Sequence, residues 1–311
     1  MLNSFIIGRN QSTNTTLKIS LPAVAWLAAA FLWCFYPVLM TLMSRWNNDP
    51  QYSHGFLVPL FAGFIAWHRK EHVSPCSANS SPTGIVLIVI GMGAYIVGTG
   101  IYFDWLVQMS MLPTLWGCMW MLGGKRLAWI SMPGVLYLIF MIPLPYSAEV
   151  AMAQPLQRVA GVVSTFLLQT AGLAAYRSGN LINVEGHVLG VAEACSGLRM
   201  LVVFFALATA VALVTERHWL QKFILVTSAV LIALFCNILR ITATGTLYVY
   251  AGPKLAETVF HDLAGWLMIP LALAMLWAEL QYMQRLFDDS WGSKTVINEQ
   301  PMTMFAKPAS T

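Results

Sequence analysis

A cysteine and an arginine stand one helical turn apart at the start of a long apolar run. Residues 193–199 read EACSGLR, and MLVVFFALATAVALV follows directly. A cysteine at a helix N-terminus faces the positive end of the helix dipole, and a nearby cation adds to this; both favour the reactive thiolate. Cys195 beside Arg199 is therefore a candidate nucleophile, whereas a cysteine alone is more often a small buried residue.

Two other apolar runs carry ionisable residues at their ends. Arg240 closes the run 219–240 in CNILRIT, and His261 opens the run 260–281 in VFHDLAGW. A histidine can take and return a proton, and an arginine can stabilise the oxyanion of a tetrahedral intermediate. Together with Cys195 they suit attack on a peptide carbonyl. Taken singly, Arg240 could extend to the membrane surface and His261 could be an ordinary helix-start residue.

A second polar cluster, WNNDPQYSHGFLVPL, covers residues 46–60. His54 and Asp49 could line the same cavity as the cysteine. The alternative is a helix start that Ser53 caps. Three other histidines fall in polar segments, where we expect them to be solvated: His68, His72 and His218.

The elements that carry these residues are predicted from composition. The chain has 311 residues, of which 58% are hydrophobic and 10% charged, against about 25% charged in soluble domains. This predicts an all-α, polytopic integral membrane protein with one catalytic domain over 19–282, between a cytoplasmic N-terminal tail (1–18) and a disordered cytoplasmic C-terminal tail (283–311). About eight runs have the length of a transmembrane helix: 20–43, 55–68, 84–102, 104–122, 127–146, 195–214, 219–240 and 260–281.

The distribution of basic residues orients these spans. With the N-terminus inside, and leaving aside Arg199 and Arg240, eleven Lys and Arg lie on the cytoplasmic side and four outside, as the positive-inside rule requires. A ninth span over 159–176 would reduce this to eight against seven. We therefore expect an amphipathic or re-entrant helix there on the outer face, followed by a short hairpin over 179–195. Cys195, Arg240 and His261 then meet at the outer face.

Several classes of protein are disfavoured. The chain has no basic stripe that would bind nucleic acid. Its five cysteines contain no CxxC pair, so a disulfide framework or zinc site is not expected; Cys34, Cys118 and Cys236 are expected to be small core residues. The first 18 residues lack the apolar segment of a secretory signal.

At these positions the sequence resembles the exosortase and archaeosortase family of multi-spanning membrane proteins. The matching segments are YSHGFLVP (52–59), MIPLP (141–145), AEACSGLR (192–199), NILRI (237–241) and HDLAGW (261–266). The most specific part is ACSGLR followed by Asn-x-x-Arg, which includes Asn237, and a downstream histidine.

The resemblance implies a cysteine transpeptidase in a bacterial inner membrane, with its active site facing outward and no metal or cofactor. It places the nucleophile on Cys195, with Arg240 and His261 as its partners. The implied substrates are exported proteins with a C-terminal Pro-Glu-Pro tail (PEP-CTERM), which would pass to an unidentified acceptor in bacteria that make exopolysaccharide. Arg199 could be the thiolate's cation partner, a ligand of a substrate carboxylate or a structural pair for Glu193.

Two other functions fit the same residues. A transporter or flippase of lipid-linked glycans would bind a diphosphate through Arg199, Arg240 and His261 and would not need the thiol. A non-catalytic scaffold of exopolysaccharide assembly would tolerate substitution at all these positions.

Overall fold

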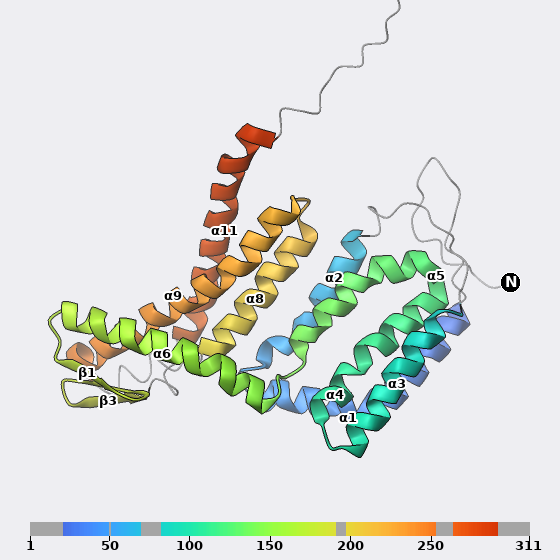
Figure 1. The fold of residues 1–311 in the computed structure, drawn as a ribbon, viewed down its shortest axis with the longest axis horizontal. Helices are drawn as coiled ribbons and strands as arrows, with labels where there is room; N and C mark the ends of the chain where they lie inside the picture. The colour runs from blue at the N-terminus through green and yellow to red at the C-terminus, as the bar shows by residue number, and fades with distance from the viewer. Residues whose placement is uncertain (1–20, 50, 70–81, 191–196, 253–263, 292–311) are drawn as a thin grey trace, which may run out of the picture.

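The computed structural model describes residues 21–49, 51–69, 82–190, 197–252 and 264–291 (Figure 1). Most of these residues are helical. The α-helices are α1 (Leu21–Asn48), α2 (Val58–Arg69), α3 (Gly84–Gly100), α4 (Asp104–Met109), α5 (Met111–Tyr137), α6 (Tyr146–Thr170), α8 (Gly197–Val214), α9 (Trp219–Ala251) and α11 (Ala264–Trp291). There are two 3-10 helices: η1 (Ser53–Phe56) precedes α2, and η2 (Leu138–Met141) follows α5. The predicted helical class is therefore correct.

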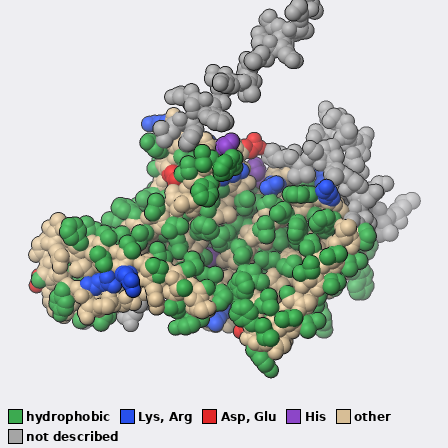
Figure 2. All heavy atoms as spheres, viewed as in Figure 1, with side chains coloured by type: hydrophobic (Ala, Val, Ile, Leu, Met, Phe, Trp, Pro, Cys, Tyr) green, Lys and Arg blue, Asp and Glu red, His purple; other side chains and the backbone are tan. Residues whose placement is uncertain are grey.

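The helices run in alternating directions, and their surfaces are apolar between the ends. Figure 2 shows charged side chains gathered toward the two ends of the bundle, with a largely hydrophobic surface between them. By length and composition, α1 and α9 can each cross a bilayer, and the bent pair made by Asp104–Met141 and α6 would give a third span. The chain is thus a membrane protein, while the predicted number of eight spans is not confirmed.

The runs 104–122 and 127–146 form two arms of one folded-back element. Figure 1 shows α5 rising beside α3, turning, and returning beside α2. The turn lies at Gly124, whose φ of 60° and ψ of −158° interrupt the helix. The Trp116 indole donates to the carbonyl of Ala128 at 2.9 Å, which ties the arms together across the turn.

Glycines allow α3 and α5 to pack with their backbones close together. Gly84, Gly91 and Gly98 form the buried face of α3, seven residues apart. A Cβ on Gly84 would lie 2.4 Å from the carbonyl oxygen of Gly117. The residues between these glycines include exposed aliphatic side chains such as Ile90, which suit a lipid environment.

Helix α6 lies across the end of the bundle. It is bent by 78° from the preceding helical segment, and the Pro-rich segment 142–145 separates the two. This agrees with an in-plane or re-entrant helix, but α6 begins at Tyr146, well before the predicted start at residue 159. The predicted span 127–146 is correspondingly too long, because α5 ends at Tyr137 and η2 at Met141.

A small antiparallel sheet follows α6, with strand order β1-β2-β3. The strands are β1 (Ala175–Ser178), β2 (Leu181–Val184) and β3 (His187–Gly190). Gly179 and Gly186, with φ of +60° and +88°, lie in the two turns and give them the left-handed backbone that glycine adopts without strain. The sheet therefore contains one strand more than the predicted hairpin, and it shares a buried apolar cluster with α6 and α9.

The C-terminal half is built on the α8–α9 hairpin, against which α11 packs. Helix α9 continues for eleven residues beyond Arg240, so the expectation that Arg240 closes this helix is wrong. Helix α11 extends to Trp291. The predicted start of the disordered tail at residue 283 therefore lies inside this helix and is wrong. Cys34, Cys118 and Cys236 are free thiols in half-buried or buried positions, as predicted.

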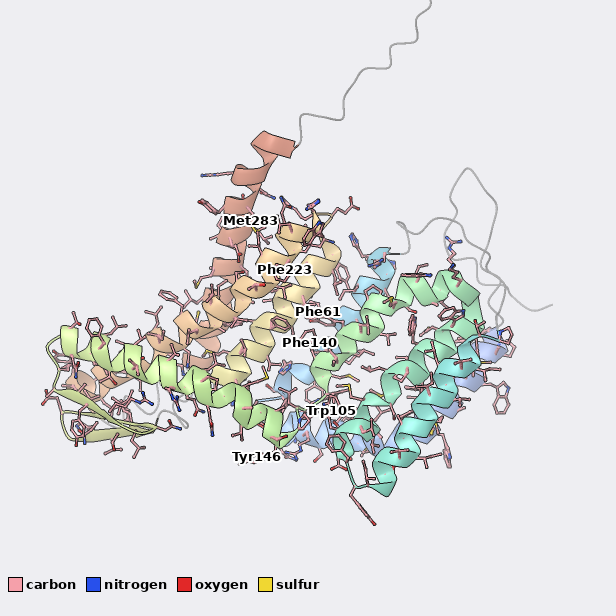
Figure 3. All side chains as sticks on the ribbon, viewed as in Figure 1. Phe61, Trp105, Phe140, Tyr146, Phe223 and Met283 are labelled. Carbon is pink, nitrogen blue, oxygen red and sulfur yellow. The ribbon has the colours of Figure 1, made fainter. Side chains whose placement is uncertain are left out.

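Two contacts cross the seam between α2–α5 and α8. His68 Nε2 lies 3.1 Å from the carbonyl oxygen of Val214, and the rings of Phe140 and Phe205 lie 5.8 Å apart. Figure 3 labels Phe140 between the two halves of the bundle. His68 is therefore a packing residue, and His218 is the N-cap of α9, where its Nδ1 accepts from Leu220 N–H at 3.4 Å. His218 is exposed, as expected, whereas the expectation that His68 is simply solvated is wrong.

Candidate active site

The segment 46–56 packs against η2 and the residues that follow it. The Trp46 indole donates to the Met141 carbonyl at 2.9 Å. Trp46 also covers Gly55, where a Cβ would lie 2.3 Å from the indole nitrogen. The hydroxyl of Tyr52 accepts from Leu144 N–H at 3.3 Å. The SHG and MIPLP sequences thus form one contact surface at the end of the bundle.

His54 is fixed by this surface. Its Nε2 lies 3.1 Å from the carbonyl oxygen of Phe140, so the ring donates from Nε2. Burial lowers the pKa of His54, and the positive charge of Arg199 adds to this, while backbone hydrogen bonding to Phe140 and Gln51 acts in the opposite direction. His54 is therefore favoured as a neutral imidazole in a defined orientation. Ser53 begins η1, whose N-cap is Tyr52 without a side-chain cap bond, so the capping alternative is wrong.

A polar network joins this surface to α6. Gln51 Nε2 donates to Glu149 Oε1 at 2.7 Å and to the Tyr52 hydroxyl at 3.3 Å. Burial, followed by the charge of Glu149, raises the pKa of Tyr52, so its phenol stays protonated. Glu149 lies in the first turn of α6, where a carboxylate is favourable at the helix N-terminus.

Arg199 occupies the face of α8 that points to this network. It stands seven residues before Ala206 and eleven before Ala210, both of which lie in the core shared with α1, α2 and α5. Arg199 interacts electrostatically with Asp49 and with His54. Its Nε is buried and has no hydrogen-bond partner among the described residues. The structure therefore brings Asp49, His54 and Arg199 together from α1, η1 and α8.

Arg240 and Asn237 lie on the adjacent helix. Arg240 is 8% exposed and Asn237 is 1% exposed. Arg240 continues the row of Ala229, Ala233 and Cys236, which packs in the core shared with α8. The interpretation that Arg240 only reaches for the membrane surface is inconsistent with this burial, because a snorkelling arginine keeps its head group in water.

The length of α9 places Arg240 at a defined depth. From Trp219 to Arg240 the helix rises about 32 Å at 1.5 Å per residue, which is close to the roughly 30 Å hydrocarbon core of a bilayer. The last eleven residues of α9 therefore rise beyond that core, where they pack against α6 and the sheet. Counting from the α8–α9 connection, Arg240 lies about 9 Å beyond the level of Arg199.

Cys195, His261 and Glu193 lie outside the described residues, so their positions relative to Arg240 remain predictions. What the structure describes is the polar surroundings: a half-buried and a buried arginine, a neutral histidine and a buried amide. Such groups can bind an anion or a polarised carbonyl at the membrane surface. Among the described residues, no group of three or more His, Cys, Asp or Glu could hold a metal ion.

Sequence reasoning missed Trp46, Gln51 and Glu149. Trp46 and Gln51 belong to the polar cluster 46–60, and Glu149 is an isolated acid in an apolar region. An isolated charge in an apolar region indicates a candidate functional residue, and this pattern could have identified Glu149. The pairing of residues 46–56 with 140–149 had no local signal, because it depends on the fold-back of α5.

Comparison with known proteins adds one finding. The family model of the transmembrane exosortases (Exosortase_EpsH) matches residues 46–278, which is most of the chain. No curated protein and no solved structure matches.

Proposed function

Since the chain belongs to the transmembrane exosortase family, we propose that it is a cysteine transpeptidase that removes the C-terminal Pro-Glu-Pro tail of exported proteins. The observation that carries this proposal is Arg240, a cation 8% exposed within a membrane helix and aligned with the row that packs against α8. Burying an arginine there is costly, and such residues generally serve function. The location we propose is the bacterial inner membrane, with the site on the outer side.

The proposed chemistry has two stages. The Cys195 thiolate attacks the scissile carbonyl, and Arg240 stabilises the oxyanion of the tetrahedral intermediate. His261 then protonates the departing amine, which leaves an acyl-enzyme thioester and releases the tail. In the second stage His261 removes a proton from the acceptor nucleophile, which attacks the thioester and expels the Cys195 thiolate, so that the thiolate and the protonated histidine are restored.

The remaining polar residues have positioning roles in this proposal. Asn237 stands one turn before Arg240, and its buried Oδ1 has no partner among the described residues, so it is available to a bound peptide. His54 and Arg199 form a polar wall toward α2, where an acidic substrate side chain would be accommodated. Glu193 is proposed as a structural partner of the cysteine segment.

The test is processing of a reporter that carries a Pro-Glu-Pro tail, co-expressed with the wild type or with Cys195→Ala. The tail should be removed by the wild type and retained with Cys195→Ala. Cys34→Ala is the matched control, because Cys34 is half-buried with its Sγ 3.8 Å from the Met92 sulfur and has no role in the proposal. Unchanged processing by Cys195→Ala would exclude Cys195 as the nucleophile.

Hydroxylamine, added as a substitute acceptor nucleophile, shows whether the acyl group passes to an amine or is hydrolysed by water. A thioester intermediate would give the reporter a C-terminal hydroxamate, which intact mass measurement distinguishes from a free acid. If Cys195→Ser keeps full cellular function, the chain fits the transport of lipid-linked glycans better than peptide transfer.

A further inference from the structure

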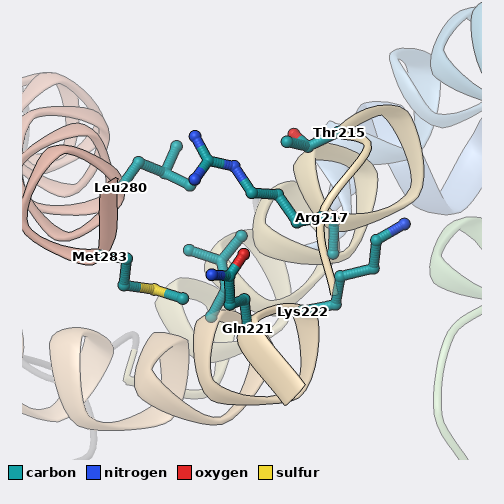
Figure 4. A pocket seen from close by; sticks show the side chains of 8 residues that line it. Thr215, Arg217, Gln221, Lys222, Leu280 and Met283 are labelled. Atoms are coloured by element: carbon teal, nitrogen blue, oxygen red, sulfur yellow. The ribbon is translucent and has the colours of Figure 1, made fainter. Parts of the chain in front are cut away.

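The opposite end of the bundle carries a pocket with a different chemistry. It lies between the α8–α9 connection and α11 and is open to the surroundings; the space there that no atom fills, open solvent included, is about 250 Å³. Its lining is divided into an apolar part, formed by Ala212, Leu225, Leu280 and Met283, and a polar part, formed by Thr215, Arg217, Gln221 and Lys222. Figure 4 shows Arg217 reaching across the pocket toward Leu280, with Met283 opposite Gln221.

The two cations of this pocket, Arg217 and Lys222, are half-buried, so their aliphatic stems pack along the apolar lining while the charges stay at the rim. Lys222 also lies within electrostatic range of a third cation, Arg69, as well as of Glu216. Among the described residues, Arg217, Lys222 and Arg69 against Glu216 make this site net positive.

The depth of the pocket indicates what it meets in a membrane. Trp219, which begins α9, is 69% exposed, and an exposed tryptophan at a helix start is typical of the boundary between head groups and acyl chains. Thr215 to Lys222 surround this residue in the chain and therefore lie at head-group depth. The apolar residues of the pocket lie on the bundle side of this level, where acyl chains begin.

A second acid lies below the pocket but is engaged. Glu279 stands one residue before Leu280, and its Oε2 accepts from the Ser228 hydroxyl at 2.6 Å. This hydrogen bond holds one carboxyl oxygen of Glu279 toward α9. The rim of the pocket itself is lined by cationic and neutral polar side chains.

We propose that this pocket binds one anionic phospholipid, with the phosphate on Arg217 and Lys222, a hydrogen bond from Gln221, and the acyl chains along Leu280 and Met283. A cationic rim beside an apolar floor at head-group depth matches the two parts of such a lipid. The lipid would fill the junction between the α8–α9 hairpin and α11. This site is separate from the proposed catalytic residues, and its occupancy does not depend on their activity.

The experiment is native mass spectrometry of the purified full-length protein with phosphatidylglycerol or phosphatidylcholine. The wild type should retain one phosphatidylglycerol in preference to phosphatidylcholine. A basic residue near the surface contributes about 1 kcal/mol to the binding of an anionic lipid, so Arg217→Gln or Lys222→Gln should weaken binding about fivefold and the double variant about 30-fold.

Three controls make the result decisive. Lys125→Gln/Arg126→Gln removes two charges from the same end of the bundle, at the turn of α5, and should leave binding unchanged. Arg217→Lys/Lys222→Arg keeps both charges and should retain the lipid, which separates charge from folding. Inorganic phosphate at the same concentration should not displace the lipid. The proposal is wrong if both lipids bind equally, if the control pair loses binding equally, or if free phosphate displaces the lipid.

Discussion

Gly55→Ala should destabilise the protein by about 2–4 kcal/mol. The new Cβ would lie 2.3 Å from the Trp46 indole nitrogen and 2.5 Å from two ring carbons, so the ring must move by about 1 Å to restore van der Waals contact. Overpacking of this kind costs about 1–3 kcal/mol. The movement also breaks the 2.9 Å hydrogen bond to Met141, which contributes about 1 kcal/mol.

Gly63→Ala is the matched control. Gly63 lies in α2, and a Cβ there would meet no atom within 4 Å, so replacing a helical glycine should stabilise by about 0.5–1 kcal/mol. Unfolding in mixed detergent and SDS micelles, followed by tryptophan emission, measures both free energies. Equal stability of the two variants, with unchanged emission, would refute the role of Trp46 in holding the polar segment.

Two further perturbations address the charged residues. Arg240→Gln should reduce tail processing about 10²–10³-fold, as loss of an oxyanion donor does, and Arg199→Gln should reduce it less; the opposite order would contradict the assigned roles. The folded-state pKa of His54 is lowered below its ordinary value of 6.5, so its contribution to stability is complete above pH 6.5 and decreases as the pH falls toward the folded-state pKa. The temperature or denaturant midpoint of unfolding of the wild type should therefore decrease as the pH is lowered below about 6.5, and His54→Gln should show a flatter dependence; identical profiles would exclude His54 as the cause.

The apolar runs predicted most helices because hydropathy is a local property. α1, α3 and α8 begin within two residues of the predicted positions. The predicted end of α9 was Arg240, because a charge normally ends an apolar run. In the structure, packing against α8, α6 and the sheet buries this residue, and the helix continues. α6 started earlier than predicted because Glu149 and Pro155 interrupt its apolar pattern without interrupting the helix.

The candidate site was predictable only in part. The sequence placed His54 and Asp49 near the segment of Arg199, and the structure brings these three residues together. The partner of His54 is the backbone carbonyl of Phe140, and no side-chain pattern can reveal a backbone acceptor 86 residues away. The fold-back at Gly124 creates this contact.

The glycine face of α3 has a consequence for how the chain can diverge. At Gly84, Gly91 and Gly98, an added methyl group would lie less than 3 Å from an atom of α4 or α5, or of the residue joining them, so any larger residue requires the neighbouring atoms to shift; at Gly84 and Gly91 these include backbone atoms. The intervening exposed positions need only be apolar. Homologous chains should therefore retain glycine at a seven-residue spacing in this helix while the aliphatic residues between them interchange freely.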